Sequence, residues 1–190
     1  MFYTALENKN INKYYLLITP IAKYISQKKR ITTTGEKMTL KTKKTPKIAK
    51  HTTPIVRKIF VNLSVKDLDK TKVFFSKLGF TFNPQFTDKK AACMIIGENI
   101  YAMLIVEEFF KSFCANKIIT DTKKNIEVLN ALNLGSKSTV DKMIQQVIGA
   151  GGKEFREAQD HGWMYARAFE DLDGHIWEVF YIDEKKMPKN

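Results

Sequence analysis

The sequence predicts an α+β fold of two tandem modules, each with the order strand, helix, strand, strand, strand. Two apolar helical stripes, at 68–78 and 138–148, are each followed by glycine. Each stripe comes after one β-rich run and before three more. Because one such module cannot cover both faces of its own sheet, the repetition predicts two halves that fold together.

The first module is predicted from 59 to about 106 and opens with an alternating, β-rich strand at 58–65. Asp67 is positioned to cap the helix, and Gly79 to end it. Spacings of three and four define the helix's buried face as Thr71, Phe74, Phe75 and Leu78. Three strand-like runs follow, at 80–86, 91–96 and 100–106.

The second module is predicted from about 126 to 184, with its first strand at 126–134. The run Ser138-Thr139-Val140-Asp141 resembles a capping box and opens a helix that a glycine-rich run at 149–152 stops. Its apolar stripe consists of Val140, Met143, Ile144, Val147 and Ile148. Three more strands follow, at 153–158, 162–169 and 175–181.

The last strand carries the sharpest chemical clue. Its side chains alternate, so that Ile176, Glu178 and Phe180 share one face while the aromatic and aliphatic residues between them share the other. Both faces are apolar, which predicts that both are covered. A lone carboxylate in such a strand must be paired, protonated or bound to a metal.

Charge divides the chain at about residue 58. The formal net charge is +12, and residues 1–58 hold 14 Lys and Arg against Glu7 and Glu36, which leaves 18 basic and 18 acidic residues in 59–190. The neutral balance of 59–190 argues against nucleic-acid binding by the folded domain. We expect 1–58 to be a basic, mostly disordered extension. An organellar transit peptide, a basic arm for an anionic partner and an extension upstream of a start near Met38 remain open.

Two further features bear on location. The longest apolar patch of the extension, at 14–22, is too short to span a bilayer and contains Pro20, so no membrane span is expected. Cys93 and Cys114 have no metal-ligand spacing. Two reduced thiols predict a cytoplasmic protein.

The chain from 59 to about 184 resembles the vicinal oxygen chelate superfamily, which includes lactoylglutathione lyase (glyoxalase), bleomycin- and fosfomycin-resistance proteins and extradiol dioxygenases. The motifs that carry the resemblance are Val65-Lys66-Asp67-Leu68, Phe74-Phe75, Leu78-Gly79-Phe80, Gly149-Ala150-Gly151-Gly152 and the run from Phe169 to Glu178. Together with the run from Asp160 to Tyr165, the last motif looks most like the predicted lactoylglutathione lyase-like proteins. The resemblance implies that 59–190 forms an open, eight-stranded, barrel-like cup that holds a small molecule.

The resemblance also implies where a metal would be bound. Metal-using members place a His, Gln or Glu on the first strand of each module and a Glu on the last. The first strand of the first module offers Phe60 and Asn62 near its ligand position, and the first strand of the second module offers Leu129, Asn130 and Ala131. On the last strand of the first module, Ala102 aligns with Glu178 of the second. Only Glu178 matches, so we assign no metal ligands, although Zn²⁺, Ni²⁺, Mn²⁺ or Fe²⁺ stays an alternative.

Arg167 is an alternative partner for Glu178. If residues 172–173 form a two-residue hairpin, Arg167 lies directly opposite Glu178 on the same face. A bulged turn would instead shift the register by one residue and place Arg167 on the other face. Both registers remain open at this point.

Four other residues are candidates for ligand binding. His161 lies in a polar loop, from which it could supply a ligand or a proton, although a histidine bonded to nearby backbone is the commoner case. Tyr165 shares the parity of Arg167 and offers a hydroxyl. Asn62 is a polar residue on an otherwise apolar strand, and Phe60 has the same parity.

Two functional hypotheses follow. In the first, a glyoxalase-related protein binds a small molecule, and Glu178 serves as general base or metal ligand in a lyase or isomerase step on a carbonyl compound. In the second, a metal-free protein sequesters its ligand in the manner implied by bleomycin resistance. A homodimer is implied by the resemblance alone.

Overall fold

A computed structural model of the chain describes residues 56–188. Predictions about the basic extension therefore lie almost wholly outside the described residues. Within residues 56–188, no helix is long and apolar enough to cross a membrane.

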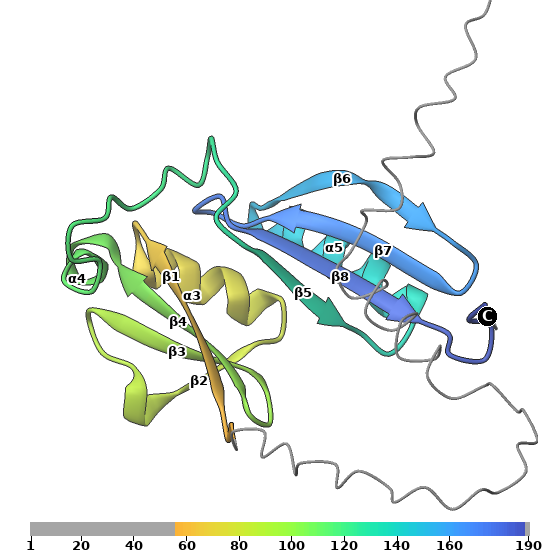
Figure 1. The fold of residues 1–190 in the computed structure, drawn as a ribbon, viewed down its shortest axis with the longest axis horizontal. Helices are drawn as coiled ribbons and strands as arrows, with labels where there is room; N and C mark the ends of the chain where they lie inside the picture. Colours follow the sequence, from red (N-terminus) through yellow and green to blue (C-terminus); the bar gives the residue numbers. More distant parts are fainter. Residues whose placement is uncertain (1–55, 189–190) are drawn as a thin grey trace, which may run out of the picture. The chain divides into compact units, whose positions relative to one another are not determined.

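The first module forms a four-stranded sheet with one long helix (Figure 1). Its elements are β1 (Ile59–Val65), α3 (Leu68–Lys77), β2 (Thr81–Asn83), the 3-10 helix η2 (Pro84–Phe86), β3 (Ala91–Gly97) and β4 (Ile100–Val106). Asp67 caps α3 as predicted, because its side chain accepts a hydrogen bond from the backbone N–H of Lys70. The strand predicted at 80–86 is shorter, since Pro84 begins a 3-10 turn that Asn83 caps.

The short helix α4 (Glu107–Lys111) follows β4, and the second module then repeats the first. Its elements are β5 (Leu129–Asn133), α5 (Lys137–Ala150), β6 (Lys153–Asp160), β7 (Met164–Glu170) and β8 (Ile176–Ile182). The strand orders β1-β4-β3-β2 and β5-β8-β7-β6 are equivalent, with the first and last strands of each module parallel. The α+β class and the tandem modules are confirmed, and the two sheets do not close into a barrel.

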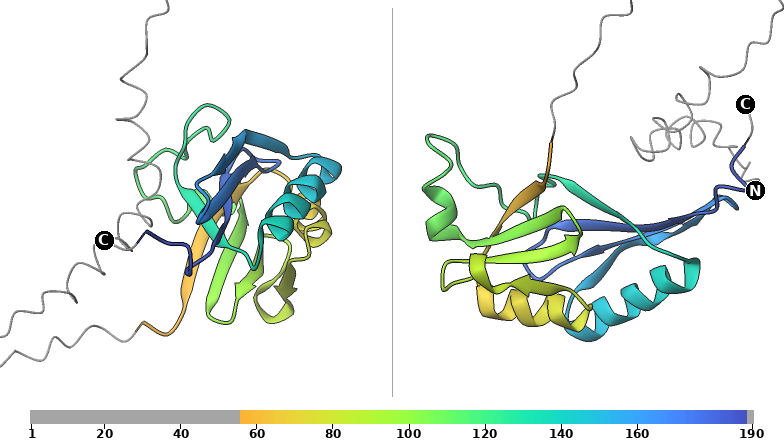
Figure 2. Two further views of the ribbon diagram at one scale, coloured as in Figure 1. Left: turned by 90° about the vertical axis from the view of Figure 1, so that its right-hand side faces the viewer. Right: turned by 90° about the horizontal axis from the view of Figure 1, so that it is seen from below.

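The hydrophobic core lies between the sheets and the two long helices. α3 and α5 contact one another and lie on the same side of the two sheets (Figure 2). Phe75 of α3 meets Trp177 of β8 with ring centroids 5.3 Å apart, which joins the two modules directly. The predicted faces of both helices are buried, except that Met143 is only partly buried and Ile148 at the end of α5 is 49% exposed.

The hairpin loop between β7 and β8 fastens the modules together. The carboxylate of Asp173 accepts hydrogen bonds from the backbone N–H of Lys66 and the hydroxyl of Thr71. Nε2 of His175 lies 2.8 Å from the carbonyl oxygen of Ser64, and Nδ1 lies 2.8 Å from Glu127. Asp173 and His175 therefore make structural contacts with the first module.

Asp171 organises the same loop from inside. One of its carboxylate oxygens accepts hydrogen bonds from three successive backbone N–H groups, and the other from Nε1 of Trp177. Burial raises the pKa of Asp171, and these donors and the nearby His175 oppose that effect. The carboxylate of Asp171 thus stabilises the turn between β7 and β8.

Candidate functional site

Each sheet has a helix side and an opposite face, which we call the open face. On β8 the core residues Trp177 and Val179 define the helix side, so Ile176, Glu178 and Phe180 lie on the open face. The parity predicted for this strand is therefore correct. Phe60 and Asn62 lie on the open face of the first sheet, because Val61 and Leu63 between them pack against the core.

Glu178 lies in the middle of its sheet between two small residues. Its neighbours across the strands are Ala131 on β5 and Ala168 on β7. Glu178 is only 5% exposed.

The partner of Glu178 is Arg156 of β6. Nη2 of Arg156 donates to Oε1 of Glu178 in a direct ion pair. The guanidinium side chain is 28% exposed, whereas the side chain of Glu178 is 6% exposed. Of the three possibilities for a buried carboxylate, Glu178 is therefore the paired one, since a buried charge is tolerated when it is paired and hydrogen-bonded.

The ion pair between Arg167 and Glu178 suggested by a two-residue hairpin is wrong. Ala168 is opposite Glu178, and Arg167 is opposite Val179 on the helix side. The backbone N–H of Asp171 donates to the carbonyl of His175, which leaves a three-residue loop that ends at Gly174 with φ of 101°. A glycine in the left-handed region closing such a loop forms a bulge, and it shifts the register by one residue.

Arg167 and Tyr165 belong to a separate polar group on the helix side. Arg167 donates to Asp141 of α5 at 2.9 Å and to Glu154 at 2.7 and 2.8 Å. The hydroxyl of Tyr165 donates to the same Asp141 at 2.7 Å. The hydrogen bond from Tyr165 and that from Arg167 lower the pKa of Asp141. These two residues therefore secure α5 to the sheet and do not share a face with Glu178.

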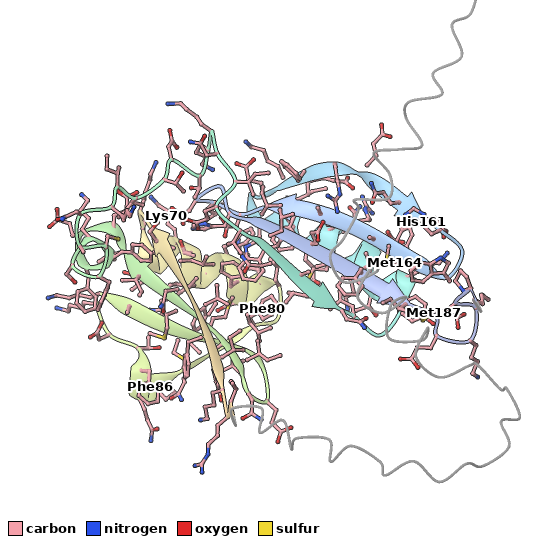
Figure 3. The ribbon with its side chains drawn as sticks, viewed as in Figure 1. Lys70, Phe80, Phe86, His161, Met164 and Met187 are labelled. Atoms are coloured by element: carbon pink, nitrogen blue, oxygen red, sulfur yellow. The ribbon has the colours of Figure 1, made fainter. Side chains whose placement is uncertain are left out.

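His161 lies far from Glu178, at the end of the second sheet where β6 turns into β7 (Figure 3). Its backbone N–H donates to the carbonyl of Met164, and its side chain is exposed. Ala168, the neighbour of Glu178, is four residues beyond Met164 along β7, which corresponds to about 13 Å of extended strand. No contact between His161 and Glu178 is expected over that distance.

Phe60 and Asn62 belong to the other sheet. Phe60 is 44% exposed and stacks on Tyr101 with ring centroids 4.8 Å apart. Among residues 56–188, no hydrogen bond or ion pair joins Phe60 or Asn62 to Glu178. Of the predicted site residues, only Glu178, Phe60 and Asn62 lie on open faces, and the structure brings none of the others to Glu178.

The residues present do not fit a divalent metal. No group of three potential His, Cys, Asp or Glu ligands is found in the described part of the chain. The alignment of Ala102 with Glu178 is also wrong, because Ala102 is fully buried on the helix side and Tyr101 and Met103 occupy the open face of β4. Glu178 is therefore not part of a three-ligand group in the described part of the chain, and Arg156 already neutralises it.

A separate cavity of about 320 Å³ lies away from Glu178, near the end of β1 and the segment after α4. Its lining includes Ser64, Lys66, Lys111, Thr122 and Asp173. The hydroxyl of Thr122 donates to the carbonyl of Asp173, whose carboxylate is bonded to Lys66 and Thr71. The polar groups of this cavity are occupied in fastening the two modules, so we place the candidate site at Glu178.

Sequence reasoning missed Arg156 and its neighbour Gln159. Both lie on β6, whose pairing with β7 shifts register twice, between Glu154 and Arg156 and between Arg156 and Gln159. Simple alternation cannot predict the faces of a strand with two irregularities. The available signal was the need of Glu178 for a cation, which on β6 and β7 could come from Lys153, Arg156 or Arg167.

The comparisons with known proteins agree with this architecture. Residues 57–97 match the family described as bleomycin resistance protein-like N-terminal. A hypothetical protein from S. aureus is 29% identical, with 67% of this chain and 95% of that chain covered and a TM-score of 0.57. No curated protein matches the chain.

Two further solved structures show the fold alone. A glyoxalase/bleomycin resistance protein/dioxygenase family enzyme from Burkholderia phytofirmans is 14% identical, with coverages of 65% and 96% and a TM-score of 0.57. A fosfomycin resistance protein from Listeria monocytogenes is 17% identical, with coverages of 69% and 97% and a TM-score of 0.51. These proteins are matched over nearly their whole length by the two modules together.

Proposed function

We propose that this chain is a member of the vicinal oxygen chelate superfamily and that it binds a small molecule over Glu178, on the open face of the second sheet. The match of residues 57–97 and the fold shared with the solved structures support this proposal. The observation that carries this proposal is the buried Arg156–Glu178 pair, flanked by alanines on the neighbouring strands. A charged pair in a sheet is not needed for folding, since apolar residues of similar volume are often as stable. Its presence is better explained by a polar ligand.

We propose that binding uses no metal. Arg156 supplies the positive charge that a metal would otherwise bring to Glu178, and the pair is bonded through Oε1. This favours a sequestering protein over a metal-dependent lyase. The bleomycin-resistance-like family match of the first module is compatible with that reading.

A lyase or isomerase step on a carbonyl compound is the second candidate. No hydrogen bond to Oε2 of Glu178 is found among residues 56–188, so this oxygen is free to approach a ligand. Glu178 would then act as a general base on a proton next to the carbonyl group. Turnover of a bound ligand, abolished by Glu178→Gln, would establish this candidate over simple binding.

The test is a thermal-shift screen of the full chain against a library of metabolites and antibiotics, with metal content measured by elemental analysis on the same sample. Hits should stabilise the wild type and the control Glu98→Gln, whose carboxylate is exposed, but not Glu178→Gln. Hits that stabilise all three proteins equally would place binding elsewhere. One equivalent of a transition metal that is lost in Glu178→Gln would overturn the metal-free proposal.

We also propose a cytoplasmic homodimer. Three large apolar residues at one end of the first sheet, Ile59, Phe60 and Ile100, are 44–52% exposed. Exposed apolar clusters favour contact with another protein surface. Sedimentation equilibrium of the full chain tests this point, and a monomer at all concentrations would contradict it. Cys93 and Cys114 are free, which suits a reducing compartment.

A further inference from the structure

Two polar side-chain atoms of residues on β6, the strand that carries Arg156, are buried and have no hydrogen-bond partner. They are Nε of Arg156, a hydrogen-bond donor, and Oε1 of Gln159, an acceptor. The large majority of buried polar side-chain atoms in proteins are hydrogen-bonded, so each such atom requires an explanation. Nδ2 of Asn130 and Nδ1 of His175 also lack a hydrogen-bond partner. The first lies on the helix side beside Trp177, and the second lies 2.8 Å from Glu127, so neither belongs to this site.

The shape of β6 brings these two residues to the same face. Residues three apart in a regular strand point to opposite sides of the sheet. Arg156 is nevertheless opposite Ala168, and Gln159 is opposite Ala166, two positions that share the open face. The register shift between Arg156 and Gln159 is responsible. Such irregularities re-aim side chains and are enriched next to binding sites.

The charges around these atoms are already matched. Arg156 is paired with Glu178, and Glu170 at the end of β7 accepts contacts from both Lys123 and Lys153. An anionic ligand would therefore approach Glu178 without an uncompensated cation to receive it. What remains unsatisfied on β6 is one hydrogen-bond donor, Nε of Arg156, and one acceptor, Oε1 of Gln159.

We propose that the ligand presents an uncharged carbonyl oxygen next to an N–H donor, as a primary amide does, to Nε of Arg156 and Oε1 of Gln159 respectively. This inference rests on the proposed function and names the chemical group that the site recognises. Glu178 acts here as a positioning residue, since it holds the guanidinium through Nη2 and leaves Nε for the ligand. Ala166 and Ala168 lie opposite Gln159 and Arg156 on β7.

Three probes of nearly the same size separate this proposal from its alternatives. Benzamide offers an acceptor and a donor, acetophenone offers the acceptor alone, and benzoate is an anion with acceptors alone. Because an unpaired buried group penalises the wrong ligand, we expect benzamide to bind at least about tenfold more tightly than either of the others. Dissociation constants of the full chain are measured by NMR titration.

Variants of Gln159 assign the preference to this site. In Gln159→Leu, benzamide should bind only as tightly as acetophenone, because the acceptor is gone. Gln159→Glu keeps an acceptor, so benzamide should still bind more tightly than acetophenone and benzoate. Gln145→Leu, a matched change at an exposed position of α5, should leave all three constants unchanged. The wild-type comparison does not depend on any variant folding.

The other outcomes each overturn the inference. Equal binding of benzamide and acetophenone means that ordered water satisfies the two atoms, and tightest binding of benzoate means an anion site. Failure of all three probes to bind also removes the amide assignment. The thermal-shift screen tests the proposed function separately. Hits that depend on Glu178 but contain no amide would support ligand binding at Glu178 and contradict only the amide assignment.

Discussion

Removing Arg156 should destabilise the domain because it leaves Glu178 buried without its cation. The side chain of Glu178 is only 6% exposed, and Arg156 is its ion-pair partner. Breaking a buried pair on one side costs on the order of 3 kcal/mol. Arg156→Met retains most of the apolar stem, so the loss should come mainly from the charge.

Urea denaturation measures this effect. With an m value of about 2 kcal/mol per M, the midpoint of unfolding should fall by about 1.5 M. The double variant Arg156→Met, Glu178→Leu removes both charges and should return to within about 1 kcal/mol of the wild type. Arg57→Met, at an exposed position, is the control.

Either of two results would refute this reasoning. Unfolding of Arg156→Met at the wild-type midpoint, within about 0.5 kcal/mol, would mean that the carboxylate is solvated or protonated without its partner. Alternatively, the double variant could be as unstable as the single one. The loss would then come from packing and not from an unpaired charge.

Three further predictions concern polar contacts and a turn that stabilise the fold. Asp173→Ala removes the acceptors for Lys66 and Thr71 and should lower the free energy of unfolding by about 2 kcal/mol, whereas an unchanged urea midpoint would remove the loop's fastening role. Gly174→Ala should cost at least about 1 kcal/mol, because φ is 101° and a new Cβ would lie 2.8 Å from the backbone of Thr122; an equally stable variant would contradict the turn. The pKa of Asp141 is lowered in the folded state, so its stabilising effect is present above the ordinary value of 3.8 and is lost as the pH falls through the folded value. The stability difference between the wild type and Asp141→Asn should therefore shrink below about pH 3.8, and a difference that grows on acidification would reverse this sign.

The fold follows from local patterns in the sequence. The helix faces built on Phe74, Phe75 and Ile144 and the cap at Asp67 are set by residues within one or two turns of each other, so their spacing predicts them. The repeated element order then predicts the two modules, because one face of each sheet must be covered by a helix. Burial of these residues agrees with the prediction.

The candidate site is set by features that the patterns do not contain. Gly174 adds one residue to the hairpin loop and moves Arg167 to the other face, although both registers are compatible with the same sequence. The two irregularities of β6 bring Arg156 to Glu178 from a position that alternation does not predict. His175 and Asp173 contact residues more than 100 positions away, so their structural role is invisible to local reasoning.

The central claim is that a ligand binds over the Arg156–Glu178 pair. The most direct measurement is a ¹H–¹⁵N NMR titration of the full chain with a hit from the thermal-shift screen, in which the Nε–H resonance of Arg156 is followed together with the backbone amides. We predict that this resonance and the amides of Ala131, Ala168 and Glu178 shift together and saturate at one equivalent. Shifts confined to the helix side around Asp141, or to the cavity near Lys66 and Lys111, would contradict the claim.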